Sequence, residues 1–151
     1  VSGCRWGFYS RIPQEFIGAW SEDSEKYISL GEQAAVVMGL QMAGAEMRNR
    51  DFYWFEDNSV VLAGLAKGNS NGAALDSGNA AIHLLMAGFR ARGWFEYVES
   101  KANWSDGASR LLELDDWSLR HGFRMSRGTI PTWPWLAPVE DRLAWVKHTC
   151  G

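Results

Sequence analysis

A short aromatic run, Phe52-Tyr53-Trp54-Phe55, constrains the fold of this chain more than any other feature. A near-continuous apolar run of this length is typical of a central strand that is covered on both faces. A helical pattern precedes it from about Ser29 to Arg48, and another follows from Asn58 to about Lys67. The expected buried face of the first helix consists of Leu30, Ala34, Val37, Met38 and Met42.

The rest of the chain continues this alternation of strands and helices. We expect strands at about 6–10, 15–20 and 94–99, and helices at about 76–90, 104–113 and 139–148. In the helix expected at about 76–90, the residues expected to face inward are Ile82, Leu85, Met86 and Phe89. The order strand, strand, helix, strand, helix, strand, helix predicts an α/β architecture with a mixed central sheet and helices on both faces.

The C-terminal part of the sequence has a different character. Three prolines and two tryptophans fall between Ile130 and Pro138, which predicts an extended segment that cannot join the interior of a sheet. We therefore divide the chain into a domain at 1–115 and a Pro/Trp-rich C-terminal extension at 116–151. A length of 151 residues suits one such domain with a sizeable core.

Charge and cysteine content restrict the classes of function. A formal net charge of −3 gives no strong global field that would attract a polyanion. Most basic residues nevertheless lie in the second half, and they form either a backbone-binding surface or an ordinary solvated face. Cys4 and Cys150 have no metal-binding spacing, which favours a reduced intracellular setting, cytoplasm or nucleus. No apolar run approaches membrane-spanning length and no signal peptide is visible.

Three carboxylates occupy positions that suit metal-dependent phosphodiester chemistry. Glu32 lies in the first predicted helix, Asp57 leaves the aromatic strand, and Asp106 lies at the start of a later helix. Hard cations take oxygen ligands, and two cations held by carboxylates stabilise both the attacking and the leaving oxygen. Each residue also has a structural interpretation. Glu32 suits a solvated helix face, Asp57 an Asx cap, and Asp106 a capping box with Asn103.

The sequence contains four short motifs whose order along the chain indicates a family resemblance. They are Leu30-Gly31-Glu32-Gln33-Ala34, then Glu56-Asp57-Asn58, then Lys67-Gly68-Asn69-Ser70, and finally the stretch from Asn103 to Arg110, which reads NWSDGASR. Together they resemble the ribonuclease H domain of retrotransposon reverse transcriptase polyproteins of the DIRS-like and gypsy-like kind, over about positions 1–112. The resemblance implies a three-layer ribonuclease H-like fold.

The same resemblance implies an activity and a set of site residues. The activity is two-metal hydrolysis of the RNA strand of RNA–DNA hybrids during reverse transcription, with two Mg²⁺ ions, or Mn²⁺ in their place. Glu32, Asp57 and Asp106 would be the catalytic metal ligands, and Asn58, Asn103, Ser109 and Arg110 would contact nucleic acid. The implied partners are the hybrid and the adjacent reverse transcriptase and recombinase or integrase domains of the same polyprotein.

The family pattern also includes an earlier Asp at the end of its first strand. Here Val1 to Gly7 is similar to the sequence that follows this Asp, so we expect an N-terminally truncated domain that lacks its first strand and its first catalytic Asp. We expect this truncated form to be inactive. An alternative is a non-catalytic ribonuclease H-like remnant that acts as a spacer or nucleic-acid-binding module. A third reading is another member of the same superfold, such as a resolvase or an exonuclease.

Overall fold

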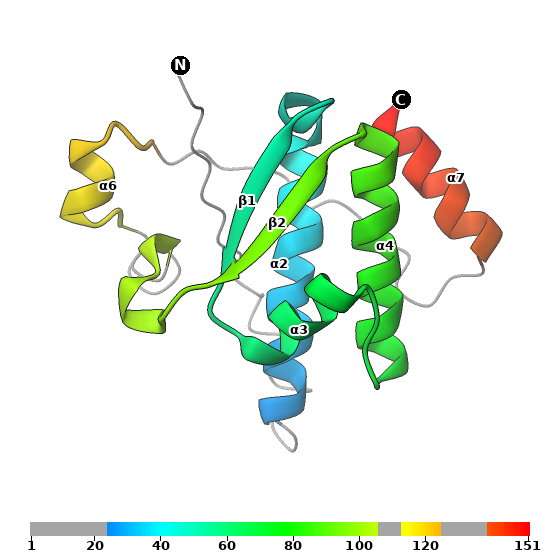
Figure 1. The fold of residues 1–151 in the computed structure, drawn as a ribbon, viewed down its shortest axis with the longest axis horizontal. Helices are drawn as coiled ribbons and strands as arrows, with labels where there is room; N and C mark the ends of the chain where they lie inside the picture. The colour runs from blue at the N-terminus through cyan, green and yellow to red at the C-terminus, as the bar shows by residue number, and fades with distance from the viewer. Residues whose placement is uncertain (1–23, 106–112, 125–138) are drawn as a thin grey trace.

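The described part of the chain is a mixed α/β structure in which helices predominate. The computed structural model describes residues 24–105, 113–124 and 139–151 (Figure 1). Its strands are β1 (Asp51–Glu56) and β2 (Arg92–Tyr97), and they pair in parallel with Asp51 opposite Arg92 and Glu56 opposite Tyr97. The helices are α2 (Ser24–Met47), α3 (Ser59–Lys67), α4 (Ala73–Phe89), the short η2 (Ser100–Ala102), α6 (Asp116–Arg120) and α7 (Val139–Cys150).

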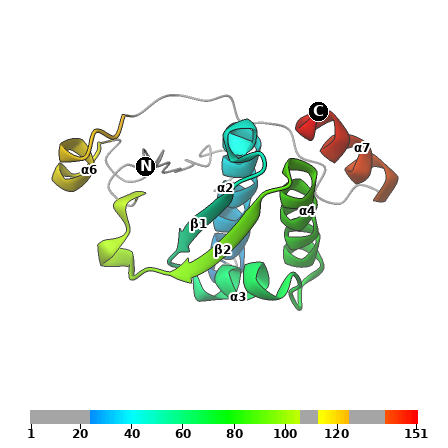
Figure 2. The same cartoon turned by 45° about the horizontal axis from the view of Figure 1, so that its top comes forward.

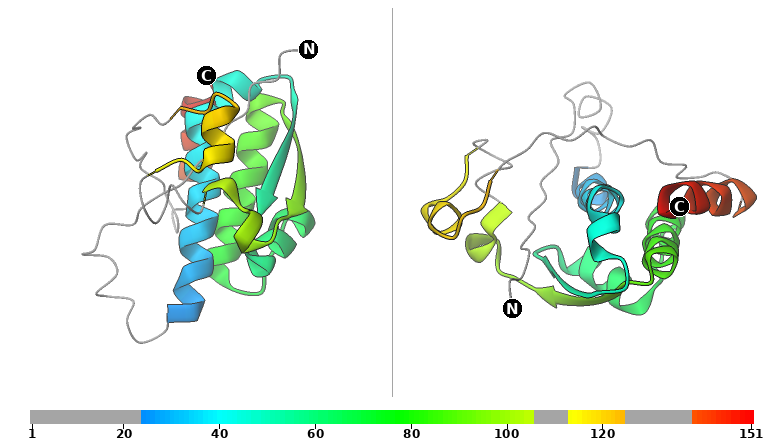
Figure 3. Two further views of the ribbon diagram at one scale, coloured as in Figure 1. Left: turned by 90° about the vertical axis from the view of Figure 1, so that its left-hand side faces the viewer. Right: turned by 90° about the horizontal axis from the view of Figure 1, so that it is seen from above.

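Two long helices cover one face of the strand pair. Figure 3 shows β1 and β2 on one side of α2 and α4, and Figure 2 shows α7 beside α4. On the covered face, Phe52, Trp54 and Phe95 pack against the helical core. On the other face Tyr53 is 72% exposed and Phe55 is 44% exposed, so the expectation that this strand is buried on both faces is wrong. Alternating exposure is typical of a strand with one covered face.

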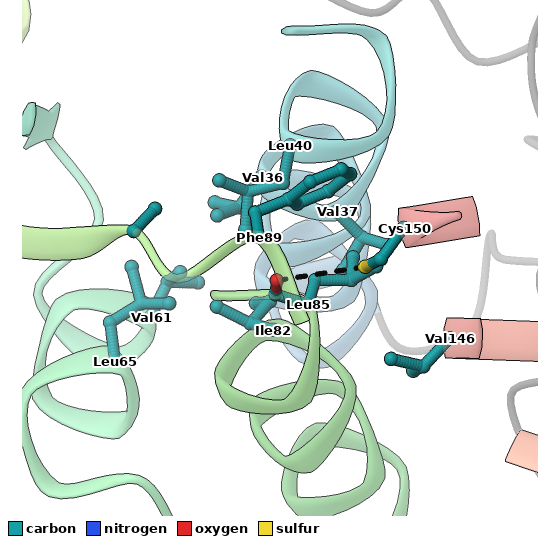
Figure 4. Packing of buried hydrophobic residues seen from close by; sticks show 11 residues of the cluster. Val36, Val37, Leu40, Val61, Leu65, Ile82, Leu85, Phe89, Val146 and Cys150 are labelled. Carbon is teal, nitrogen blue, oxygen red and sulfur yellow. Dashed lines mark hydrogen bonds between the residues drawn. The ribbon is translucent and has the colours of Figure 1, made fainter. Parts of the chain in front are cut away.

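The core lies where α2, α3, α4 and α7 meet. Its buried members are Val36, Val37, Leu40, Val61, Leu65, Ile82, Leu85, Phe89, Ala91, Val146 and Cys150 (Figure 4). The inward face expected for α4 is confirmed at Ile82, Leu85 and Phe89. The face expected for α2 is confirmed at Val37 but wrong at Met42, which is 46% exposed. The buried face of α2 is turned toward Val36 and Leu40 because α4 packs there.

Glycines let α2 and α4 approach each other closely. A Cβ atom added to Gly78 of α4 would lie 2.0 Å from the Oε1 atom of Gln33 on α2. A Cβ atom added to Gly44 of α2 would lie 2.1 Å from the ring of Phe89 on α4. Both separations are shorter than any tolerable contact, so a larger residue at either position would force the buried Gln33 or Phe89 side chain, or the helix that carries it, to move.

Hydrogen bonds at the ends of α3 fix where this helix begins and ends. The Oδ1 atom of Asn58 accepts from the backbone N–H of Val60 and of Val61, which satisfies two donors of the first turn. At the other end Gly68 has a φ of 79°, and its N–H donates to the carbonyl oxygen of Gly64. A left-handed residue after a helix is usually glycine, because glycine adopts this conformation without strain.

Several sequence expectations lie outside the described residues. They are the strands at 6–10 and 15–20, the Pro/Trp-rich segment at 130–138, and the greater part of the helix expected at 104–113. Within the described residues, no helix is both long enough and apolar enough to cross a membrane. The short helix α6 was not expected from the sequence. It begins at a cap in which the Asp115 side chain accepts from the N–H of Ser118.

Candidate metal centre

The end of β1 brings two carboxylates beside a third from α2. Glu56 is the last residue of β1, Asp57 follows it directly, and Glu32 projects from α2. Each of the three offers a carboxylate oxygen, and these oxygens all lie within 4.8 Å of one another. Strand alternation explains the arrangement, because Phe52, Trp54 and Glu56 share the face that packs on the helices.

Burial of this cluster shifts its protonation. Glu56 is 7% exposed, and its burial, together with a hydrogen bond to Glu32, raises the pKa of the Glu56 carboxyl to about 8. Burial also raises the pKa of Glu32, opposed by the hydrogen bond from Glu56 and assisted by the charge of Asp57. Without a cation, Glu56 therefore keeps its proton near neutral pH and uses it in a hydrogen bond that the Glu32 carboxylate accepts. Two adjacent carboxylates that cannot both ionise freely are characteristic of such shared sites.

A hydrogen-bond network fixes the loop that carries these carboxylates. The backbone N–H of Asn58 donates to Oε1 of Glu56 at 3.2 Å, while its side-chain amide donates to the Ser29 hydroxyl at 3.2 Å. Ser29 is one helical turn before Glu32 on α2, so this bond ties the end of β1 to the same helix. The relative positions of Glu32 and Glu56 are therefore set by the start of α3 as well as by core packing.

A second amide, from the segment after η2, also contacts the cluster. The Nδ2 atom of Asn103 donates to Oδ2 of Asp57 at 3.2 Å. The Oδ1 atom of the same Asn103 accepts from the backbone N–H of Ser105 at 3.1 Å and from its hydroxyl at 2.8 Å. Asn103 thus connects Asp57 to the chain that follows β2 and η2.

The predicted site residues have different outcomes. The structure brings Glu32 and Asp57 together, and it places Asn58 and Asn103 in direct contact with the cluster. The remaining three predicted residues, Asp106, Ser109 and Arg110, lie outside the described residues. Binding of nucleic acid by Asn58 and Asn103 stays a prediction. In the structure the Asn58 side chain caps α3, and the Asn103 side chain bonds to Asp57 and Ser105.

Sequence reasoning missed Glu56 as a member of the cluster. The residue stands next to Asp57 in the motif Glu56-Asp57-Asn58, but only Asp57 was expected to lie beyond the end of the strand, where a metal ligand is accessible. A signal was available in the alternation of β1. Counting by twos from Phe52 through Trp54 places Glu56 on the helix-facing side, where an unpaired carboxylate is costly.

The donor set fits a hard divalent cation. Three carboxylates supply only oxygen ligands, which Mg²⁺, Mn²⁺ and Ca²⁺ prefer over softer donors. A bound cation would also replace the proton held by Glu56 and neutralise the repulsion among the three groups.

Comparisons with known proteins assign no family to this chain. No protein family, curated protein or solved structure matches it.

Proposed function

We propose that this chain is a ribonuclease H-like domain of a retroelement polyprotein, whose acidic cluster binds divalent cations for hydrolysis of RNA in RNA–DNA hybrids. The observation that carries the proposal is the convergence of Glu32, Glu56 and Asp57 at the end of a parallel strand. The Glu32 helix and the Asp57 strand end are two of the three elements of this chain to which the family resemblance assigns metal ligands.

The arrangement of the elements supports the same proposal. β1 and β2 run in parallel and are connected through α3 and α4, while α2 crosses the covered face. The carboxyl ends of parallel strands meet at one edge of a sheet, which is where α/β proteins commonly place their sites. The ribonuclease H-like arrangement of three layers is the finer form of this α/β fold that we propose.

The residues of the cluster and their neighbours would divide into cation ligands and residues that hold those ligands in place. Glu32, Glu56 and Asp57 would hold the cations. When bound, two Mg²⁺ ions supply Lewis acidity to the attacking water and the leaving oxygen. Asn58 holds the Glu56 carboxylate through its backbone N–H, and its link to Ser29 keeps α2 in register with the loop. Asp106 joins the proposed ligand set on the resemblance alone.

Recognition of the hybrid would depend on shape rather than on sequence. Proteins that bind A-form-like duplexes contact phosphates and 2′-hydroxyl groups, because side chains cannot read the deep, narrow major groove. The proposed partners are therefore an RNA–DNA hybrid and the neighbouring polymerase and recombinase or integrase domains of the same polyprotein.

The experiment that tests this function is cleavage of an end-labelled RNA–DNA hybrid in the presence of Mg²⁺. RNA–RNA and DNA–DNA duplexes of the same sequence serve as controls. Because the resemblance implies a further carboxylate ahead of Val1, the assay compares the chain with a version extended upstream. We expect hybrid-specific cleavage by the extended version alone, and Asp57→Asn in that version should abolish it. A folded extended protein that leaves the hybrid intact would contradict the enzymatic assignment and favour the non-catalytic module.

A further inference from the structure

Asn103 joins the candidate metal centre to a helix start. Its Nδ2 atom donates to the Asp57 carboxylate, and its Oδ1 atom accepts from both the N–H and the hydroxyl of Ser105. Asn103 is half-buried and follows η2, whereas Asp57 follows β1, so the contact links two segments that are 46 residues apart. The contact therefore adds to the pairing of β1 with β2 in fixing how these two segments lie.

The two sets of bonds determine which way the amide points. If the amide were turned by half a rotation, its oxygen would face the Asp57 carboxylate and its NH₂ group would face the N–H of Ser105. Both contacts would then be repulsive, because a carboxylate only accepts and a backbone N–H only donates. The cap at Ser105 therefore holds the amide with its donor directed at Oδ2 of Asp57.

We propose that Asn103 is a positioning residue that orients the Asp57 carboxylate for cation binding, through a hydrogen bond that its own capping bonds keep in place. This inference rests on the proposed function. Carboxylates that bind metal ions are commonly held by outer hydrogen bonds, and loss of such a partner weakens metal affinity by roughly 10–100-fold.

The test separates the capping role from the orienting role. Asn103→Ser keeps a side-chain oxygen suited to an N-cap but removes the amide donor to Asp57. Asp115→Ser is the matched control, since Asp115 caps α6 by accepting from Ser118 and is not a member of the acidic cluster. Affinity for Mn²⁺ alone is measured by calorimetric titration of the full chain, and thermal unfolding of each variant is followed in parallel.

We expect Asn103→Ser to weaken Mn²⁺ binding by about 10-fold or more while Asp115→Ser leaves it unchanged. The midpoints of thermal unfolding without metal should be similar for Asn103→Ser and the parent chain. Equal Mn²⁺ affinity in the parent and Asn103→Ser would overturn the inference and leave the proposed metal centre intact. Equal losses in both variants would overturn it as a general effect of weakened caps. Absence of Mn²⁺ binding by the folded parent would overturn the proposed function and this inference together.

Discussion

The carboxyl group of Glu56 shares a hydrogen bond with that of Glu32, although one residue ends a strand and the other lies within a long helix. Phe52 and Trp54 of β1 pack on the helical core, and Asn58 links Glu56 to α2 through its bonds to Glu56 and Ser29. The relationship has consequences for stability, because a buried carboxyl group that keeps its proton responds to pH differently from an exposed one.

The metal-free protein should lose stability as the pH rises from about 4.5 to about 8. The pKa of Glu56 is raised from 4.5 to about 8 in the folded protein, so the folded state binds this proton more tightly than the unfolded state. The contribution is complete below pH 4.5 and lost as the pH approaches 8. One proton gives a slope of roughly 1.4 kcal/mol per pH unit in the free energy of unfolding.

Urea denaturation across this pH range measures the slope, with a metal chelator present. Glu56→Gln is the control, because the amide remains neutral at every pH and can still donate to Glu32. The variant should show a flatter profile and exceed the parent in stability by several kcal/mol above pH 8, as a pKa raised from 4.5 to about 8 implies. Parallel profiles for the two proteins would contradict the assignment of the shared proton to Glu56.

Gly78→Ala should destabilise the protein although alanine is the better helix former. In open space the change would stabilise a helix by about 1 kcal/mol. Here the new Cβ atom would lie 2.0 Å from Oε1 of Gln33, so either the buried Gln33 side chain gives up its hydrogen bonds to Leu75 and Asn79 or α2 and α4 separate. We expect a net loss of about 1–3 kcal/mol in the free energy of unfolding, measured by urea denaturation.

A double-mutant cycle identifies the source of that loss. If the Gln33 side chain causes it, Gly78→Ala should cost much less in a Gln33→Ala background than in the parent chain. Gln33→Ala carries its own cost, because Gln33 donates to the Leu75 carbonyl and to the Asn79 side chain. Additive effects of the two changes would show that the close approach at Gly78 has been misjudged.

Asn58→Ala should cost about 1 kcal/mol or more in stability by removing the cap of α3. The side chain accepts from two backbone N–H groups and donates to Ser29, and alanine replaces none of these bonds. Asn58→Ser should recover most of the loss, since serine caps nearly as well. Thermal unfolding of the three proteins decides the matter, and equal midpoints would contradict a structural role for this side chain.

Local patterns in the sequence predict most of the described elements. The residues of β1, α3, α4, β2 and α7 fall within a few positions of their expected bounds, because capping residues and hydrophobic periodicity act over short distances. Asn58 illustrates this, since a cap at the start of α3 is readable from the chain alone. The helix α2 begins at Ser24, five positions before its expected start at Ser29.

Contacts between distant elements were harder to predict. Which face of α2 is buried depends on α4, and the exposure of Tyr53 depends on what covers the sheet. Glu32 and Asp57 could be proposed as partners from their positions on a helix and at a strand end, together with a family resemblance, but their contact with Glu56 could not. Glu56 was overlooked because its role depends on burial against α2 rather than on any motif. The bond from Asn103 to Asp57 spans 46 residues and has no local signal.

The central claim is that Glu32, Glu56 and Asp57 form a divalent cation site. Calorimetric titration of the chain with Mn²⁺, at a pH above the Glu56 pKa of about 8, tests it most directly. The matched variants are Asp57→Asn and Glu46→Gln, because Glu46 is an exposed carboxylate on the same helix as Glu32. The account predicts saturable binding that Asp57→Asn weakens by at least about 10-fold and Glu46→Gln leaves unchanged. Absence of saturable binding, or the same affinity in the parent and both variants, would contradict it.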